Sequence, residues 1–177
     1  MNITRISLAV LLIALSATLS GCGLIFGGDQ SVDTKSRDYS VLRLDKLQRS
    51  KWRTIESRST PDSSDVAYEN PSTGSIISLN SICRGNEKSS LKELSRALMM
   101  GLKKQSSIET REYSISGISA LESTVDAETI DHKTVRIRTV VMRKDRCTYD
   151  VMYVSPRENF HRELNVFNDF LKGFHVE

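Results

Sequence analysis

Four strand-like segments follow one another with short links between two amphipathic helices, and this order limits the possible folds more than any other feature. The segments are 110–118, 120–127, 133–142 and 146–154. In the last of them, Cys147, Tyr149, Val151 and Tyr153 share one face, as the two-residue period of a strand requires. Successive strands with short links form an antiparallel sheet. The sequence therefore predicts an α+β protein, with an antiparallel β-sheet covered by two amphipathic helices.

The first helix is predicted over residues 91–104. Ser90 and Glu93 form a capping-box pattern, in which each side chain accepts a hydrogen bond from the other residue's backbone N–H. A stripe of leucines follows at helical spacing, at positions 91, 94, 98 and 102. This stripe indicates one buried face.

The second helix carries the stronger pattern. Large apolar residues recur at positions 160, 164, 167, 171 and 174, which places the helix against the sheet. Ser155 is the expected N-cap, with Pro156 and Glu158 in the first turn. Gly173 is placed to end the helix.

A β-hairpin is predicted upstream of both helices. Segments 65–69 and 75–83 flank the loop Asn70-Pro71-Ser72-Thr73-Gly74. Weaker alternation at 39–44 and 52–57 predicts two further short strands.

The N-terminus reads as an export signal. Residues 6–19 are mostly apolar, but this stretch is shorter than the roughly 20 residues that a transmembrane helix needs. It ends in Leu19-Ser20-Gly21-Cys22, which resembles the lipobox of bacterial lipoproteins. This resemblance implies cleavage before Cys22 and acylation of Cys22 by membrane lipid. Gly23, in place of Asp, points to the outer membrane rather than the inner one. The alternative is an ordinary secretory signal with a chance cysteine.

The expected organisation follows from these patterns. Residues 1–21 are a lipoprotein signal peptide, 22–38 a lipidated tether, and 39–177 a single α+β domain. The mature protein is expected to be anchored to the bacterial envelope with its domain in the periplasm.

With Cys22 lipidated, Cys83 and Cys147 are the two remaining cysteines. In an oxidising compartment they are expected to form a disulfide. The alternative is two separate buried thiols that pack as small hydrophobes.

Composition and motifs argue against several classes of function. The net charge is +3, and aromatic residues rarely stand among the basic ones, so nucleic-acid binding is not expected. No glycine-rich phosphate loop or nucleophile elbow is present. His132, His161 and His175 are expected in solvent, and most of the acidic residues 109, 112, 122, 126 and 128 on exposed strand faces. The sequence predicts no catalytic residue, metal site or cofactor.

Basic residues gather on the hairpin predicted from segments 133–142 and 146–154. They stand at positions 133, 136, 138, 143, 144 and 146. They form either a positive strip for lipid headgroups or an acidic partner, or a solvated face whose charges protect a sheet edge. We favour the solvated face.

The order of elements resembles the PsbP-like superfamily, which includes bacterial DcrB-type lipoproteins. The resemblance covers roughly residues 39–177. It is carried by Trp52, by the hairpin Asp65-Val66-Ala67-Tyr68-x-Asn70-Pro71-x-x-Gly74, and by Tyr149, Tyr153 and Pro156 before the phenylalanine-rich last helix. It implies an α/β/α sandwich that acts as a non-enzymatic, membrane-tethered accessory or assembly module, with no catalytic constellation.

Three functions remain open from the sequence. The favoured one is a binding module that docks on an envelope protein of unknown identity. The second is a carrier of a lipid or small molecule, in a pocket between the sheet and the C-terminal helix. A hydrolase would require a buried cluster of serine, histidine and carboxylate.

Overall fold

The computed structural model describes residues 38–47, 51–56, 64–83 and 88–177, which belong to one compact unit. The predicted signal peptide, Cys22 and nearly all of the tether lie outside the described residues. Among the described residues, no helix is both long and apolar enough to span a membrane.

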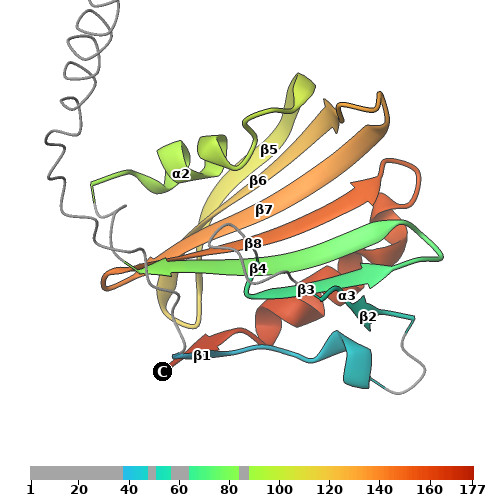
Figure 1. Ribbon diagram of the computed structural model, residues 1–177. Coiled ribbons are helices and arrows are strands. Elements are labelled where there is room, and N and C mark those ends of the chain that lie inside the picture. Colours follow the sequence, from blue (N-terminus) through green and yellow to red (C-terminus); the bar gives the residue numbers. More distant parts are fainter. Residues whose placement is uncertain (1–37, 48–50, 57–63, 84–87) are drawn as a thin grey trace, which may run out of the picture. The chain divides into compact units, whose positions relative to one another are not determined.

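The main sheet has seven antiparallel strands in the order β2-β3-β4-β8-β7-β6-β5 (Figure 1). The strands are β2 (Arg53–Thr54), β3 (Val66–Asn70), β4 (Ser75–Cys83), β5 (Lys103–Ile115), β6 (Ile118–Glu128), β7 (Thr134–Lys144) and β8 (Cys147–Pro156). The hairpin β3–β4 and the four consecutive strands β5–β8 confirm the sequence prediction. Strand β8 returns from β7 to pair with β4, and so joins the two halves into one sheet.

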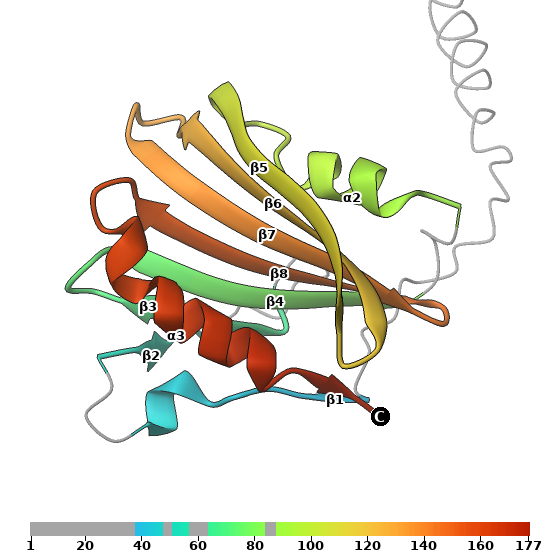
Figure 2. The ribbon, with the colours of Figure 1, turned by 180° about the vertical axis from the view of Figure 1, so that it is seen from behind.

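One helix covers each face of this sheet. Helix α2 (Leu91–Ala97) lies over β6 and β7, and helix α3 (Phe160–Lys172) crosses the opposite face near β4 and β8 (Figures 1 and 2). The predicted α+β class, with an antiparallel sheet and two covering helices, is confirmed.

The larger core lies between the sheet and α3. Alternate residues of β8 point into it, and Tyr153 stacks on Phe167 with ring centroids 5.4 Å apart. The apolar stripe at 160–174 is buried or partly buried as predicted, and Val166 and Phe170 add two further apolar side chains to it. A smaller core of Met99, Val125, Ala127, Val135 and Ile137 lies on the α2 face.

Helix α2 is shorter than the predicted 91–104. The Ser90–Glu93 capping box is present, with Ser90 N–H donating to Glu93 Oε2 at 2.7 Å. The helix ends at Ala97, because the chain tightens into turns and Gly101 takes a left-handed φ of 89°. From Lys103 onward the backbone pairs with β6 as the start of β5.

The N-cap predicted for the last helix is wrong. Ser155 is still in β8, opposite Arg136, and its hydroxyl lies 2.9 Å from that of Ser75. Helix α3 begins at Phe160 with Asn159 as N-cap. The hydroxyl of Ser155 therefore bonds to Ser75 on the neighbouring strand and does not cap the helix.

The N-terminal segments form less sheet than predicted. β1 (Tyr39–Ser40) pairs with β9 (His175–Val176) in a separate two-stranded ribbon rather than with the main sheet. A short 3₁₀ helix, η1, spans Leu44–Lys46, and β2 is limited to two residues.

Candidate functional site

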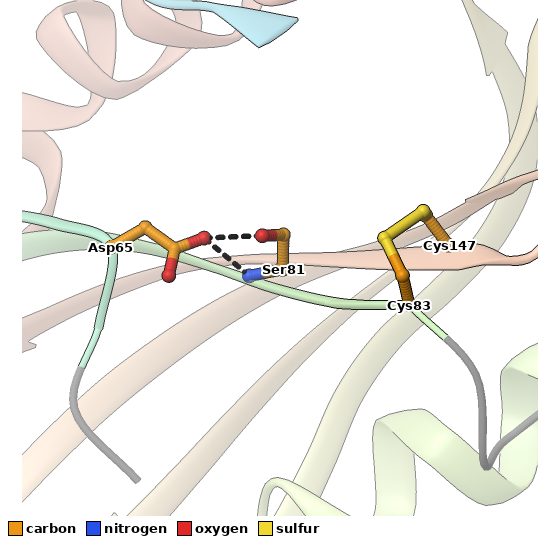
Figure 3. Close-up of a disulfide and its surroundings, with 4 residues drawn as sticks. All are labelled: Asp65, Ser81, Cys83 and Cys147. Atoms are coloured by element: carbon orange, nitrogen blue, oxygen red, sulfur yellow. Dashed lines mark hydrogen bonds between the residues drawn. A yellow bond between two sulfur atoms is a disulfide. The ribbon is translucent and has the colours of Figure 1, made fainter. Parts of the chain in front are cut away.

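The disulfide is the one predicted pair of site residues that lies within the described chain. Cys83 ends β4 and Cys147 begins β8, directly opposite each other in the strand register. Their sulfurs are bonded (Figure 3). On the same strand, Ser81 donates its backbone N–H, at 2.8 Å, and its hydroxyl to Asp65 Oδ2. The disulfide thus links β4 to β8, and the Ser81 contacts link β4 to Asp65, the residue before β3.

A charged cluster occupies the α3 face of the sheet, on β6 and β7. Asp126 and Arg136 are opposite each other in register. Arg136 donates from Nε to Asp126 Oδ1 at 2.7 Å and from Nη2 to Oδ2 at 2.9 Å. Arg157 adds a contact of 3.5 Å to Oδ2. The hydrogen bonds from Arg136 hold the pKa of Asp126 below its usual value.

Glu122 is the most deeply buried member of this cluster, with 3% of its side chain exposed. Arg111 Nη2 donates to its Oε2 at 3.1 Å, and Arg138 Nη1 lies 3.6 Å from its Oε1. The Tyr113 hydroxyl donates to Oε2 at 3.4 Å. Burial, with the charge of Glu122, raises the pKa of Tyr113 to about 12.

The cluster corrects the expectation that Glu122 lies on an exposed strand face. Glu122 stands between Arg111 of β5 and Val140 of β7 in an interior strand, and alternation turns it toward α3 together with Ala120. A buried carboxylate needs compensating donors, which here come from β5 and β7. Those partners depend on strand register, which residue types alone did not reveal.

The basic residues behave in two ways. Lys133 and Arg146 are exposed, as the favoured solvated face requires, whereas the other four, Arg136, Arg138, Arg143 and Lys144, are partly buried. The guanidinium carbons of Arg136 and Arg138 lie 5.5 and 5.7 Å from the ring centre of Phe160 in α3. Arg143 donates to the Ser89 carbonyl, and Lys144 to the carbonyls of Val176 and Glu177. These basic groups hold the helices and the C-terminus to the sheet.

A pocket of about 340 Å³ opens beside this cluster, between α3 and strands β5 and β6. Arg111, Tyr113 and Glu122 line one side of it, and Asn168, Leu171 and Lys172 of α3 line the other. Its remaining wall comes from residues 114–116, next to the tight turn at Ser116 and Gly117. The pocket offers cations, a carboxylate, a phenol and apolar side chains, which suits a polar ligand that both donates and accepts hydrogen bonds.

The histidines stand outside this site. His132 is exposed and lies 2.6 Å from Glu128 through Nδ1, and His161 and His175 are also exposed. Among the described residues, no group of three His, Cys, Asp or Glu side chains is placed to hold a metal ion.

Comparison with known proteins identifies the fold. No protein-family model matches the chain, and no curated protein sequence matches it. Solved structures do match. The solution structure of the PsbP protein of the cyanobacterium Synechocystis has a TM-score of 0.56 at 12% identity, and the match covers 90% of this chain and 99% of that one.

Two further structures share the architecture. LpqN of Mycobacterium tuberculosis, described as involved in cell envelope biogenesis, gives a TM-score of 0.52 at 11% identity, over 83% of this chain and 86% of that one. A protein of Bacteroides thetaiotaomicron gives a TM-score of 0.53 at 8% identity, and the match covers 79% of this chain and 45% of that one. At such low identity these matches establish a PsbP-like fold and nothing finer.

Proposed function

We propose that this chain is a bacterial envelope lipoprotein, anchored through acylated Cys22, whose domain acts as a non-enzymatic accessory or binding module. The observation that carries the proposal is the conjunction of a lipobox, Leu19-Ser20-Gly21-Cys22, with a PsbP-like domain a short tether away. The description of LpqN as an envelope-biogenesis protein supports a role for this fold at an envelope. In this proposal the domain comprises residues 39–177 and faces the periplasm from the outer membrane.

The charged cluster is consistent with a structural rather than a chemical role for its arginines. Arg136 and Arg138 are each engaged with a carboxylate of β6 and with Phe160. Side chains held from two sides stiffen the packing of α3 on the sheet, and a rigid domain loses less entropy on binding a partner.

The anchor is tested by measuring the intact mass of the protein from native envelopes. We expect a chain that begins at Cys22 and carries acyl chains, and alkylation of Cys83 and Cys147 only after reduction. A Cys22→Ala variant is the matched control and should lose the acyl mass. An unlipidated wild-type mass would contradict the proposal.

The binding role needs a separate measurement. Crosslinking in intact cells, followed by purification of the tagged chain, should recover a defined envelope protein with wild type. Recovery should fall strongly with Cys22→Ala, because the tether keeps the domain at the membrane surface. Recovery of lipid alone would count against a protein partner.

A second candidate is a carrier, favoured by the pocket between the sheet and α3. Its volume falls within the roughly 300–1,000 Å³ of small-molecule sites. Its lining argues for a polar cargo, since Arg111, Glu122 and Lys172 would be costly to cover with an alkyl chain. Native mass spectrometry of the protein released gently from envelopes should then show a bound small molecule, and a ligand-free spectrum would remove this candidate.

A further inference from the structure

A second pocket lies on the other face of the sheet, between α2 and strands β5 and β6. Its volume is about 440 Å³, again in the range of roughly 300–1,000 Å³ for small-molecule sites. Figure 1 shows α2 on this face, and Figure 2 shows α3 on the opposite one. The pocket is thus separated from the charged cluster by the thickness of the sheet.

Helix α2 and the turn after it supply one wall. Lys92, Ser95, Arg96 and Met99 recur at i, i+3, i+4 and i+7, so they face the same side. Met99 and Ser95 are buried, and Ser95 donates its hydroxyl to that of Ser123 at 3.1 Å. Lys92 and Arg96 are exposed, and so form the rim.

Strands β5 and β6 supply the floor. Leu121, Ser123 and Val125 alternate along β6 and are all buried. In β5 the register shifts between Ser107 and Glu109, and this bulge turns both Ser107 and Thr110 toward the pocket. Ser107 then lies opposite Val125, and Thr110 opposite Ser123.

Gln105 fixes the end of the pocket wall that α2 and the turn after it form. Its amide nitrogen donates to the carbonyl of Met99 at 2.8 Å and to that of Leu102 at 3.1 Å. These bonds hold the turn after α2 against the first residues of β5. They close one end of the pocket.

The charge of the lining is positive. Lys92 and Arg96 line the pocket, and no carboxylate of the described residues does. Within the described part of the chain, neither cation forms a close ion pair, although hydrogen bonds from Ser90, helped by the charge of Arg96, lower the pKa of Glu93. The closest acidic residue on the helix, Glu93, accepts hydrogen bonds from the Ser90 backbone and hydroxyl at 2.7 and 2.9 Å. Glu112 stands opposite Leu121 on this face but does not line the pocket.

We propose that this pocket binds a small amphipathic anion. The anionic group, a carboxylate or a phosphate, lies between Lys92 and Arg96, where it also meets the serine and threonine hydroxyls. The apolar part of the ligand rests on Met99, Leu121 and Val125. Two exposed cations at the rim and buried apolar side chains at the floor together match this class of molecule.

The proposal is tested by calorimetric titration of the full chain in zwitterionic nanodiscs, with the heat of empty nanodiscs subtracted. Octanoate, octyl phosphate and octanol are the probes. We expect saturable binding of at least one anion, about tenfold or more tighter than that of octanol. Preference for octanoate indicates a free fatty carboxylate as ligand, and preference for octyl phosphate indicates a lipid-type phosphate.

Two double variants locate the site. Lys92→Gln with Arg96→Gln should weaken anion binding by about tenfold or more, because both cations are removed. Lys46→Gln with Arg162→Gln removes the same charge from exposed positions outside both pockets and should leave affinity unchanged. Ser107→Trp, at an exposed strand position, should fill the pocket and abolish binding of all three probes.

Three results would overturn the proposal. They are the absence of saturable binding by either anion, octanol binding as tightly as the anions, and loss of affinity in the control double variant rather than in the Lys92, Arg96 variant. Circular dichroism of each variant checks that the domain is folded, so that a loss of binding reports on the pocket.

Discussion

Arg136 and Arg138 show how strand alternation and strand register contribute different information about a side chain. Alternation along β7 places both arginines on the face opposite Val135 and Ile137. It did not identify Asp126 and Glu122 as their partners, because pairing depends on the exact register across the turn at 129–133. The sequence therefore supplies the charged residues of the cluster but not the pairs that they form.

The Asp126–Arg136 pair should make stability depend on pH. The pKa of Asp126 is lowered in the fold, so its stabilising effect is present above the unfolded value of about 3.9 and is lost as pH falls through the folded value. Asp126→Asn should cost about 1–3 kcal/mol at neutral pH, because the carboxylate charge and one of the two bonds from Arg136 are lost at a partly buried site. Urea unfolding should show this difference at pH 7 and a much smaller one at about pH 3.

Asp169→Asn is the matched control for that measurement. Asp169 pairs with Lys172 on the exposed side of α3, with 60% of its side chain in solvent. Exposed pairs contribute little, so we expect a change of about 0.5 kcal/mol or less. An Asp126→Asn effect of the same size at both pH values would show that the carboxylate charge is not what stabilises the site.

At the scale of elements, the boundaries of both helices differ from the local patterns. The leucine spacing at 91–102 continues past Ala97, but the chain from Lys103 onward pairs with β6 instead. The break predicted at residue 119 also comes too late, because the hairpin turn lies at Ser116 and Gly117, where φ is 50° and 81°. Periodicity identifies an element well, whereas its ends are decided by neighbours that are distant in sequence.

Gly173 ends α3 as predicted, but for a different reason. Its φ is −82°, so no left-handed conformation requires glycine here. A Cβ at this position would instead lie 2.9 Å from Leu42 Cβ and 3.2 Å from Leu42 N. The glycine allows the segment before η1 to pass directly over the helix end.

We expect Gly173→Ala to destabilise the domain by about 1–3 kcal/mol, as overpacking does elsewhere. The cost arises because part of the clash is with backbone, which cannot rotate away. Lys172→Ala, one residue earlier on the exposed surface, should have little effect. Thermal unfolding of both variants tests this. An unchanged unfolding midpoint for Gly173→Ala would mean that Leu42 can move away from the added methyl group without cost.

For the whole molecule, the sequence was sufficient to predict the class and the order of the layers. The four-strand run, the hairpin and the two amphipathic stripes each form the predicted kind of element. The pairing of β8 with β4 could not be predicted, because it joins strands separated by α2 and three further strands. The ribbon of β1 and β9 was equally inaccessible, since two-residue strands carry no periodicity.

The Cys83–Cys147 disulfide should contribute substantially to global stability. It spans 64 residues, for which the chain-entropy model gives about 4 kcal/mol. Urea unfolding of wild type and of the Cys83→Ser, Cys147→Ser double variant should differ by an amount of this order. Adding reductant should lower the stability of wild type but not of the variant. Equal stabilities without reductant would show that the bridge does not constrain the unfolded chain.

The covalent closure of β4 onto β8 also makes the intervening part of the chain a ring. Helix α2 and strands β5, β6 and β7 all lie within it. A protease that cuts once anywhere in this ring, for example at an exposed turn, leaves both fragments attached to one another. In an envelope that contains proteases, a molecule cut once in this ring would remain one covalent molecule until the disulfide is reduced.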